Sequence, residues 1–348
     1  MAALKIVHLP SYEVNPYQRN LAEAQRKLGH EVLEGGGGGS FLRTALFHWK
    51  ADVLHFHWLH PYLLRPSRVG SIFRSLRFLL EITVIRLRGT RIVWTIHNLK
   101  NHDNHHTGIE RFFSALFTRY CRICIVHSNH AADMARQRFA MKKKALKVIP
   151  HPSYVGLYPD TMTKEDSRAR LGIAGDAFVF LFLGRINAYK GIFDLMEAFR
   201  RLGTSERVIL LIAGIPGDET TRECILEEAR NEPRIRPFLE RVADDELQLF
   251  FKAADVAVYP YRQILTSGAV ILGMSFGCFL IAPDVPTIRE TVAPEGAFFF
   301  QPGNPESLQE KMRASLCKDL ADGGMANLHR ARNWSLEKVA DQTLEAVG

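Results

Sequence analysis

The chain has 348 residues, of which 47% are hydrophobic and 24% are charged, as is ordinary for a globular protein with a sizeable core. This length favours two domains and excludes a collagen-like, a disordered or a small disulfide-stabilised chain. The net charge of +8 is uneven: residues 1–155 carry 23 Lys and Arg against 9 Asp and Glu, and residues 156–348 carry 22 against 28. We therefore expect the first half to meet an anionic partner, such as a nucleic acid, a membrane surface or a phosphorylated substrate.

The cysteines and the N-terminus favour a cytoplasmic protein. Five scattered cysteines suit a reducing compartment. Cys121 and Cys124 form a CxxC within an apolar run, and without a second pair or a nearby histidine they predict buried thiols rather than a zinc site. The N-terminus lacks the pattern of a signal peptide. Residues 264–283 are uncharged but interrupted by glycines, which indicates a turn, a buried helix and a buried strand rather than a membrane span.

Short β-rich runs alternate with helical patterns throughout, as in parallel sheets with crossover helices. In the first half, strands are expected at residues 4–9, 31–34, 53–56, 91–96, 122–127 and 146–149, with a helix at 16–28. Two prolines at 150 and 152 then break the pattern, and residues 153–164 resemble a linker. Residues 1–152 therefore form the first predicted domain.

A second α/β series follows, with strands expected at residues 178–183, 208–213, 256–259, 279–282 and 297–300. Helices are expected at 191–201, 219–231, 245–253, 267–276, 306–317 and 334–347. This pattern predicts a second domain over residues 165–330 and a C-terminal segment, 331–348, that packs back on the first domain. The predicted fold class is α/β, with two doubly wound, Rossmann-like domains facing across a cleft. Ligands of such sheets bind beyond the carboxyl ends of the strands.

Five consecutive glycines, residues 35–39, follow a predicted strand. Their spacing does not fit the GxGxxG pattern, and no helical pattern begins there. They favour a mobile loop, with a phosphate-binding loop as the alternative.

Two basic residues lie on one strand-to-helix loop of the second half. Gly184 and Arg185 end the apolar strand at 178–183, and Lys190 and Gly191 open the next helix. Arg185 and Lys190 can converge on a diphosphate, assisted by the N-terminus of that helix. The alternative is an ordinary solvated loop.

A second helix start in this half also suits phosphate. Thr266, Ser267 and Gly268 precede an apolar helix, where small residues leave backbone N–H groups open to an anion. The alternative is a plain helix cap, for which Thr266 or Ser267 would suffice.

In the first half, polar residues cluster after the predicted strands. They are Asn15 and Tyr17; His55, His57, Trp58 and His60; His97 and Asn98; and His102, Asp103, His105 and His106. Several histidines at consecutive strand ends favour a functional site, although any single one is more often structural. Their spacings match no zinc pattern, and no DxD motif is present to hold Mg²⁺, so we expect no metal.

Residues 65–91 combine seven arginines and one acidic residue, Glu81, with a dense apolar stripe. Two interpretations remain open: a helix buried on one face with its arginines reaching solvent, or a helix lying on an anionic membrane. A second basic stretch, 136–147, could share the same face. Nucleic acid is a competing partner, but we expect none, because no helix-turn-helix, RRM or OB pattern is visible.

The motifs GR-x4-KG after a strand, DVAVYPYRQILTSGAVILGMSFGCFLIAP, and HN at a strand end resemble those of nucleotide-sugar glycosyltransferases of GT-B fold. The combination of NPY, VLHFHW, IHN…HD and YRQ..TSG is most similar to bacterial exopolysaccharide transferases of the xanthan β-mannosyltransferase type. The resemblance extends over nearly the whole chain.

This resemblance implies an enzyme that moves a hexose, with mannose favoured, from a nucleotide sugar to a polyprenyl-diphosphate-linked oligosaccharide. GDP-mannose is favoured over a UDP-hexose, and no other cofactor is implied. The enzyme would lie peripherally on the inner leaflet through the face around residues 65–91. The implied donor-binding residues are Gly184, Arg185, Lys190, Gly191, Tyr261, Thr266, Ser267 and Gly268, with Asn15, Tyr17, His97 and Asn98.

One departure concerns the mechanism. Retaining GT-B enzymes carry a Glu-x7-Glu motif, whereas Ile264 and Leu272 stand at the matching positions here. An inverting, metal-independent reaction is therefore favoured, with a base from the first domain: Asp103 first, then His57 and His102. Arg185, Lys190 and the amides of residues 266–268 would neutralise the leaving diphosphate. The alternatives are a retaining transferase, a UDP-sugar epimerase of the same fold, and a non-enzymatic nucleic-acid-binding protein.

Overall fold

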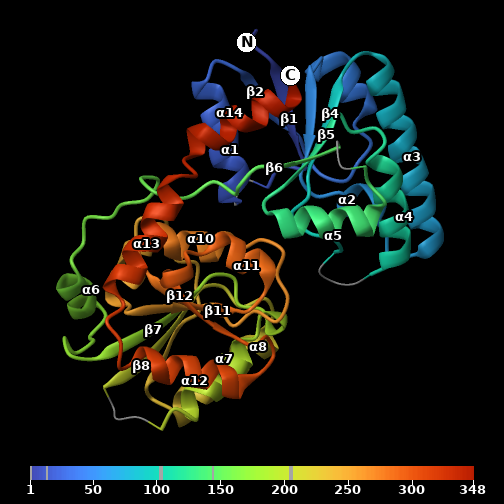
Figure 1. Cartoon of the computed structure of the whole chain (residues 1–348). Helices are drawn as coiled ribbons and strands as arrows, with labels where there is room; N and C mark the ends of the chain where they lie inside the picture. Colours follow the sequence, from blue (N-terminus) through green and yellow to red (C-terminus); the bar gives the residue numbers. More distant parts are fainter. Residues whose placement is uncertain (1, 13–14, 102–104, 143–144, 204–206) are drawn as a thin grey trace. The chain divides into compact units, whose positions relative to one another are not determined.

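The computed structural model describes residues 2–12, 15–101, 105–142, 145–203 and 207–348, which form two compact units (Figure 1). The first unit comprises Met1–Pro152 and Leu336–Gly348, and the second comprises Ser153–Ser335. The second unit thus begins at the start of the segment that the sequence suggested as a linker. The chain returns to the first unit five residues later than the expected boundary at residue 331.

The first unit contains a six-stranded parallel sheet with the order β2-β1-β3-β4-β5-β6. Its strands are β1 (Lys5–Leu9), β2 (Glu31–Glu34), β3 (Val53–Phe56), β4 (Arg91–Thr95), β5 (Ile123–Val126) and β6 (Leu146–Val148). In the register of β1 and β3, His8 pairs with His55. Paired residues of neighbouring strands point to the same face, so these two side chains lie side by side.

The helices of the first unit are α1 (Pro16–Lys27), η1 (a π-helix, Thr44–Trp49), α2 (His60–Leu63), α3 (Arg68–Leu87), α4 (Thr107–Phe117), α5 (Asn129–Phe139) and α14 (Leu336–Val347). Helix α14 packs along α1, where Ala340 contacts the cluster of Tyr17, Leu21 and Ala24 (Figure 1). Val339 also joins the core beneath the sheet. The last helix is therefore an integral part of the first unit.

The second unit contains another six-stranded parallel sheet, with the order β12-β11-β10-β7-β8-β9. Its strands are β7 (Phe178–Leu183), β8 (Val208–Ala213), β9 (Ile235–Phe238), β10 (Val256–Val258), β11 (Phe279–Pro283) and β12 (Ala297–Phe300). Its helices are α6 (Lys164–Arg170), η3 (Ala188–Lys190), α7 (Ile192–Arg200), α8 (Glu219–Asn231), α9 (Leu247–Ala253), α10 (Gly268–Ser275), α11 (Pro286–Thr291), η4 (Pro294–Gly296), α12 (Pro305–Ser315) and α13 (Ala321–Arg332). Strands β7 and β8 are almost continuously apolar and buried, as expected where helices cover both faces of a parallel sheet.

The expected strands are all present, with ends that agree to within one residue. Several elements were not predicted, among them helices α4, α5, α6 and α11, strand β9 and helix α13. Strand β9 contains Arg236 and Pro237, and it is an edge strand, where proline is tolerated. Helix α13 contains Gly323 and Gly324, which are poor helix formers, but a Cβ at Gly324 would stand 2.2 Å from the carbonyl oxygen of Gly277. Glycine is therefore required at position 324 by the close approach to Gly277, although it lowers the helix propensity of this segment.

The glycine-rich segment 35–39 packs against the first unit. A Cβ at Gly35 would lie 2.5 Å from Leu9 Cδ2, and one at Gly38 would lie 2.8 Å from Arg74 Nη2. A Cβ at Gly36 or Gly39 would meet nothing within 4 Å, so glycine allows close approach in only part of this segment, and the mobility of the loop stays a prediction.

The apolar stretch at 264–283 forms a turn, α10 and β11, as predicted. No helix among the described residues is long and apolar enough to cross a membrane.

Candidate active site

The order of the strands identifies where the second sheet would bind a ligand. Strand β7 leads to β8 on one side of it, whereas the neighbouring strand β10 leads to β11 on the other side. The loops that follow β7 and β10 therefore diverge at the carboxyl edge of the sheet. Open α/β sheets bind their ligands at such a switch point.

Glycines let the loops at this edge approach closely. Gly191 has a φ of +80°, and a Cβ on it would lie 2.0 Å from the carbonyl oxygen of Pro260. Similarly, a Cβ on Gly214 would lie 2.0 Å from the carbonyl oxygen of Gly184. Any side chain at 191 or 214 would push the loops apart, so both positions require glycine.

Lys190 is held at this edge by Arg185 and Tyr261. Its Nζ donates a hydrogen bond to the backbone oxygen of Arg185 at 3.2 Å and lies 5.6 Å from the centroid of the Tyr261 ring. Burial, and then the charge of Arg185, lower the pKa of Lys190 to about 8. The positive charges of Lys190 and Arg185 repel each other, and a bound anion would offset this repulsion, so the pair is suited to bind an anion.

The N-termini of α7 and α10 lie at the same edge as Lys190. Ser267 Oγ accepts from the amide of Val270 at 3.2 Å and donates to the Tyr261 hydroxyl at 3.4 Å, so α10 is capped while Tyr261 is fixed. Helix α7 begins at Gly191 without a side-chain cap. Thr266 and Gly268 are half-buried beside Ser267. All eight residues of the second half that were expected to bind the nucleotide-sugar donor thus lie on the loops after β7 and β10.

Sequence reasoning missed the ion pair that braces these loops. Arg262 donates to both carboxylate oxygens of Asp194, at 2.8 and 2.7 Å, and so ties the loop after β10 to the first turn of α7. These residues lie 68 positions apart, and no local pattern links them. The half-buried apolar residues Ile264 and Leu272 pack against the core of the second unit.

A different constellation occupies the carboxyl edge of the first sheet. Histidines lie at or just after the end of five neighbouring strands: His8 on β1, His55 and His57 at β3, His97 after β4, His127 after β5 and His151 after β6. The ring of Tyr17, at the start of α1, lies 4.7–5.7 Å from the rings of His57, His97, His127 and His151. The carboxyl ends of parallel strands meet at one edge, which explains this clustering.

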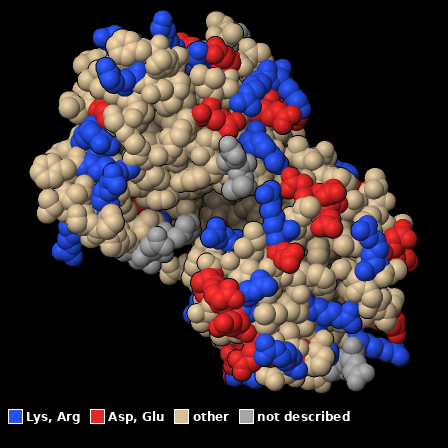
Figure 2. Space-filling view, turned by 180° about the vertical axis from the view of Figure 1, so that it is seen from behind, with Lys and Arg blue, Asp and Glu red and all other residues tan. Residues whose placement is uncertain are grey.

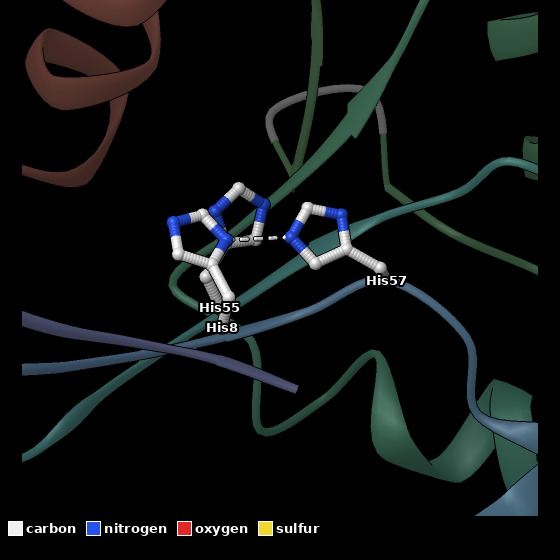
Figure 3. A group of neighbouring side chains, drawn as sticks. All are labelled: His8, His55 and His57. Atoms are coloured by element: carbon white, nitrogen blue, oxygen red, sulfur yellow. Dashed lines mark hydrogen bonds between the residues drawn. The ribbon is translucent and has the colours of Figure 1, made fainter. Parts of the chain in front are cut away.

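Three of these histidines form a hydrogen-bonded row. His8 Nε2 lies 2.8 Å from Gln25 Oε1, and His8 Nδ1 lies 2.7 Å from His57 Nε2 (Figure 3). His57 Nδ1 in turn lies 3.2 Å from His97 Nε2. His55 stands outside the row, because its Nε2 pairs with Thr95 Oγ1 at 2.7 Å.

Burial keeps these imidazoles neutral at pH 7. It lowers the pKa of His8 and of His127 to about 4 and that of His151 to about 3. The pKa values of His55, His57 and His97 are also lowered well below the usual range, by burial first and by neighbouring histidines second. Neutral imidazoles can bind metals, and His8, His55 and His57 each offer a nitrogen within 4.8 Å of the others.

The remaining predicted site residues have varied surroundings. Asn15 caps α1, with its Oδ1 accepting from the amide of Tyr17 at 3.0 Å. Tyr17 is buried, and Asn98 is half-buried beside His97. Their binding of a donor stays a prediction. His102 and Asp103, two of the three expected catalytic residues, lie outside the described residues, and the third, His57, is only 1% exposed.

Helix α3 is apolar on two faces. Phe78, Ile82 and Ile85 are buried on one side. On the other, Phe73, Leu76 and Leu80 are 68%, 53% and 64% exposed, together with the exposed Val69, Ile72 and Leu87. In Figure 2 the charged side chains along the left margin of the first unit are mainly Lys and Arg. The structure thus confirms that one face of this helix is buried, whereas contact of its exposed face with a membrane stays a prediction.

Residues 163–322 match the sequence profile of the family described as Glycosyl transferases group 1. This segment contains the whole switch-point loop cluster of the second unit. The second unit is therefore a group 1 glycosyl transferase domain, and the protein is a glycosyltransferase of GT-B fold.

Individual relatives agree with this class. The chain is 27% identical over 300 residues to a GDP-mannose:glycolipid 4-beta-D-mannosyltransferase from Xanthomonas campestris pv. campestris, covering 84% of this chain and 77% of that protein. Among solved structures, sucrose-phosphate synthase from Thermosynechococcus elongatus superposes with a TM-score of 0.79 at 17% identity, over 98% of both chains. Anabaena Alr3699/HepE in complex with UDP gives 0.77 at 16% identity, over 98% and 99% of the two chains. These structures confirm the α/β fold of two parallel, helix-covered sheets.

Proposed function

We propose that this glycosyltransferase moves mannose from GDP-mannose to a lipid-linked oligosaccharide, with inversion at C1 and without a metal ion. The observation that carries the proposal is the pair of cations, Arg185 and Lys190, at the switch point of a group 1 domain. The choice of mannose follows the Xanthomonas relative, whose name gives GDP-mannose as donor and a glycolipid as acceptor. A role in exopolysaccharide synthesis follows from the same resemblance.

The donor diphosphate would occupy the carboxyl edge of the second sheet. The ammonium of Lys190 would exchange its bond to the backbone of Arg185 for a phosphate oxygen, and Arg185, which is exposed, would bind the same group. The uncapped amides at the start of α7 and those near Ser267 supply further donors. These groups offset the charge that develops on the leaving diphosphate, which is what a metal ion does in other enzymes.

Inversion is favoured by two observations. The matching positions of the retaining motif hold Ile264 and Leu272, which carry no carboxylate. The Xanthomonas relative is named for a β-linked product, and nucleoside diphosphate mannose is an α-linked donor. In an inverting reaction the acceptor hydroxyl attacks C1 in line while a base removes its proton. The candidates that the sequence offers for this base are Asp103, His57 and His102.

We further propose that the enzyme is peripheral to the inner leaflet of the cytoplasmic membrane through α3. The open apolar face of this helix carries Phe73, Leu76 and Leu80, and arginines at 65, 68 and 77 lie on or beside it. Apolar side chains that enter the interface add to the attraction between arginines and anionic lipid. A polyprenyl-diphosphate acceptor is embedded in such a surface.

The test is a transfer assay with purified full-length protein, polyprenyl-diphosphate oligosaccharides in anionic vesicles, and GDP-mannose or UDP-hexoses as donors. We expect transfer from GDP-mannose in the presence of EDTA, with a β-mannosyl product by NMR. An α-linked product would establish the retaining alternative, and donor conversion without acceptor would establish the epimerase. Salt-sensitive binding of DNA or RNA without any transfer would replace the proposal with the nucleic-acid alternative.

A further inference from the structure

The histidine row of the first unit has a defined direction. Gln25 Oε1 can only accept a hydrogen bond, so His8 carries its hydrogen on Nε2. A neutral imidazole has one N–H group, so His8 Nδ1 must accept from Nε2–H of His57. By the same argument, His57 Nδ1 accepts from Nε2–H of His97. The row therefore leaves His97 with its lone pair on Nδ1.

Packing fixes the ring of His97 as well as its tautomer. Trp58 stacks on it with centroids 4.8 Å apart and an interplanar angle of 21°. Tyr17 meets it edge-on, at 4.7 Å and 84°. His97 is half-buried, whereas His57 is 1% exposed and His8 is fully buried. Of the three histidines in the row, His97 is the one that a substrate can touch.

We propose that His97 is the base that takes the proton from the acceptor hydroxyl, and that His57, His8 and Gln25 are positioning residues that hold its lone pair on Nδ1. This inference rests on the proposed transferase function. As the acceptor oxygen bonds to C1, the bond from C1 to the diphosphate oxygen breaks and its electron pair leaves with the nucleoside diphosphate. The hydroxyl proton passes to Nδ1 of His97 and is later released to solvent.

The surroundings of His97 suit this task. A neutral ring has a lone pair available at pH 7, and a hydroxyl that is bonding to C1 becomes acidic enough for a weak base to deprotonate. The positive charge that then develops on His97 is shared through Nε2–H with His57, and from there along the polarised row. Buried rows of this kind are stronger than isolated hydrogen bonds.

A metal at His8, His55 and His57 is the competing interpretation of this cluster. His8 Nδ1 and His57 Nε2 are 2.7 Å apart, which is a hydrogen-bond distance. Two nitrogens bound to one tetrahedral zinc, with bonds of about 2.0–2.1 Å, lie about 3.3 Å apart. Binding a metal would therefore require these rings to separate and the row to break, so the observed geometry favours hydrogen bonding.

The experiment measures kcat and the GDP-mannose affinity of full-length His97→Ala with a lipid-linked acceptor. We expect kcat to fall about 10²–10³-fold, as for loss of a general base. Donor affinity should be nearly unchanged, because the inference gives His97 a role on the acceptor in place of the donor binding that the family resemblance implied. Added imidazole should restore part of kcat, which a merely structural defect would not allow. Gln25→Leu should lower kcat less, and Gln25→Glu, which keeps an accepting oxygen, should recover it.

The matched control is His55→Gln, which alters the same buried cluster outside the row and should change kcat only a few-fold. Retained GDP-mannose binding shows that each variant is folded, and His97→Asn serves if the alanine variant does not fold. High kcat in His97→Ala, or no response to imidazole while Asp103→Asn is inactive, would overturn the inference. A stoichiometric metal whose removal abolishes activity would also overturn it. Absence of transfer by the wild type with every donor would instead count against the proposed function.

Discussion

Gly191 lies so close to Pro260 that a Cβ on residue 191 would stand 2.0 Å from the proline carbonyl oxygen. This contact joins the loop after β7 to the loop after β10 and sets the space around Lys190. We predict that Gly191→Ala lowers GDP-mannose affinity by about tenfold or more, because the loops must separate and alanine pays about 1–2 kcal/mol for the positive φ. Isothermal titration calorimetry measures the affinity.

The matched control is Gly172→Ala in the same unit. Gly172 has a φ of +61°, but a Cβ there meets nothing within 4 Å. This variant should lose a similar backbone contribution to stability while it binds donor as the wild type does. Equal binding by both variants would show that the Gly191–Pro260 contact does not shape the donor site.

Donor binding should weaken as pH rises through the pKa of Lys190, which is about 8 in the free protein. A bound diphosphate favours the charged form, so affinity is full below this pKa and declines above it. Between pH 7 and 9 the protonated fraction falls about tenfold, and the GDP-mannose dissociation constant should rise by a similar factor.

Lys190→Met should bind weakly and lose this pH dependence, which separates it from any titration of the guanine base. Lys311→Met makes the same charge change at a residue paired with Glu310 and should behave as the wild type. A wild-type affinity that stays constant from pH 7 to 9 would exclude a titrating Lys190 from the site.

The first unit should be sensitive to acid. Its buried histidines have pKa values lowered from 6.5, to about 4 for His8 and His127, so between these values the unfolded chain binds more protons than the folded one. Stability is therefore full above about pH 6.5 and declines below it, by on the order of 1–2 kcal/mol per histidine at pH 5. Urea unfolding followed by tryptophan fluorescence at pH 7.5 and 5 measures this. Equal unfolding free energies would mean that the histidines are not buried as described.

Membrane binding should depend on the open face of α3. We predict that replacing Phe73, Leu76 and Leu80 by serine abolishes sedimentation with anionic vesicles, because about 1.5–3 kcal/mol per large apolar side chain is lost. Met325→Ser, at a 55% exposed apolar residue of the second unit, is the control. Unchanged sedimentation of the triple variant would show that the membrane contact is not made by this face of α3.

The sequence was sufficient for most of the fold because buried parallel strands are continuous apolar runs. Strands β7 and β8 were predicted with the observed bounds. It could not predict β9, where Pro237 argues against a strand unless its edge position is known. Likewise, the glycines of α13 argue against a helix unless the contact with Gly277 is known.

The candidate site was predictable where chemistry is local. Arg185 and Lys190 lie on one loop, so their convergence followed from spacing. The histidine row was not predictable, because it joins Gln25 on α1 to residues that follow β3 and β4. The sequence placed His57 among the candidates for the base, but only the structure shows that His57 is buried and hydrogen-bonded to the less buried His97.

The measurement that tests the donor site most directly is the titration of GDP-mannose into wild-type protein and Arg185→Ala. Arg207→Ala is the control, because Arg207 precedes β8 at the opposite edge of the sheet and pairs with Asp176. Loss of a charged bond to phosphate costs about 1.5–3 kcal/mol, so Arg185→Ala should bind at least about tenfold more weakly while Arg207→Ala matches the wild type. Wild-type affinity in Arg185→Ala would contradict a donor site at the carboxyl edge of β7 and β10.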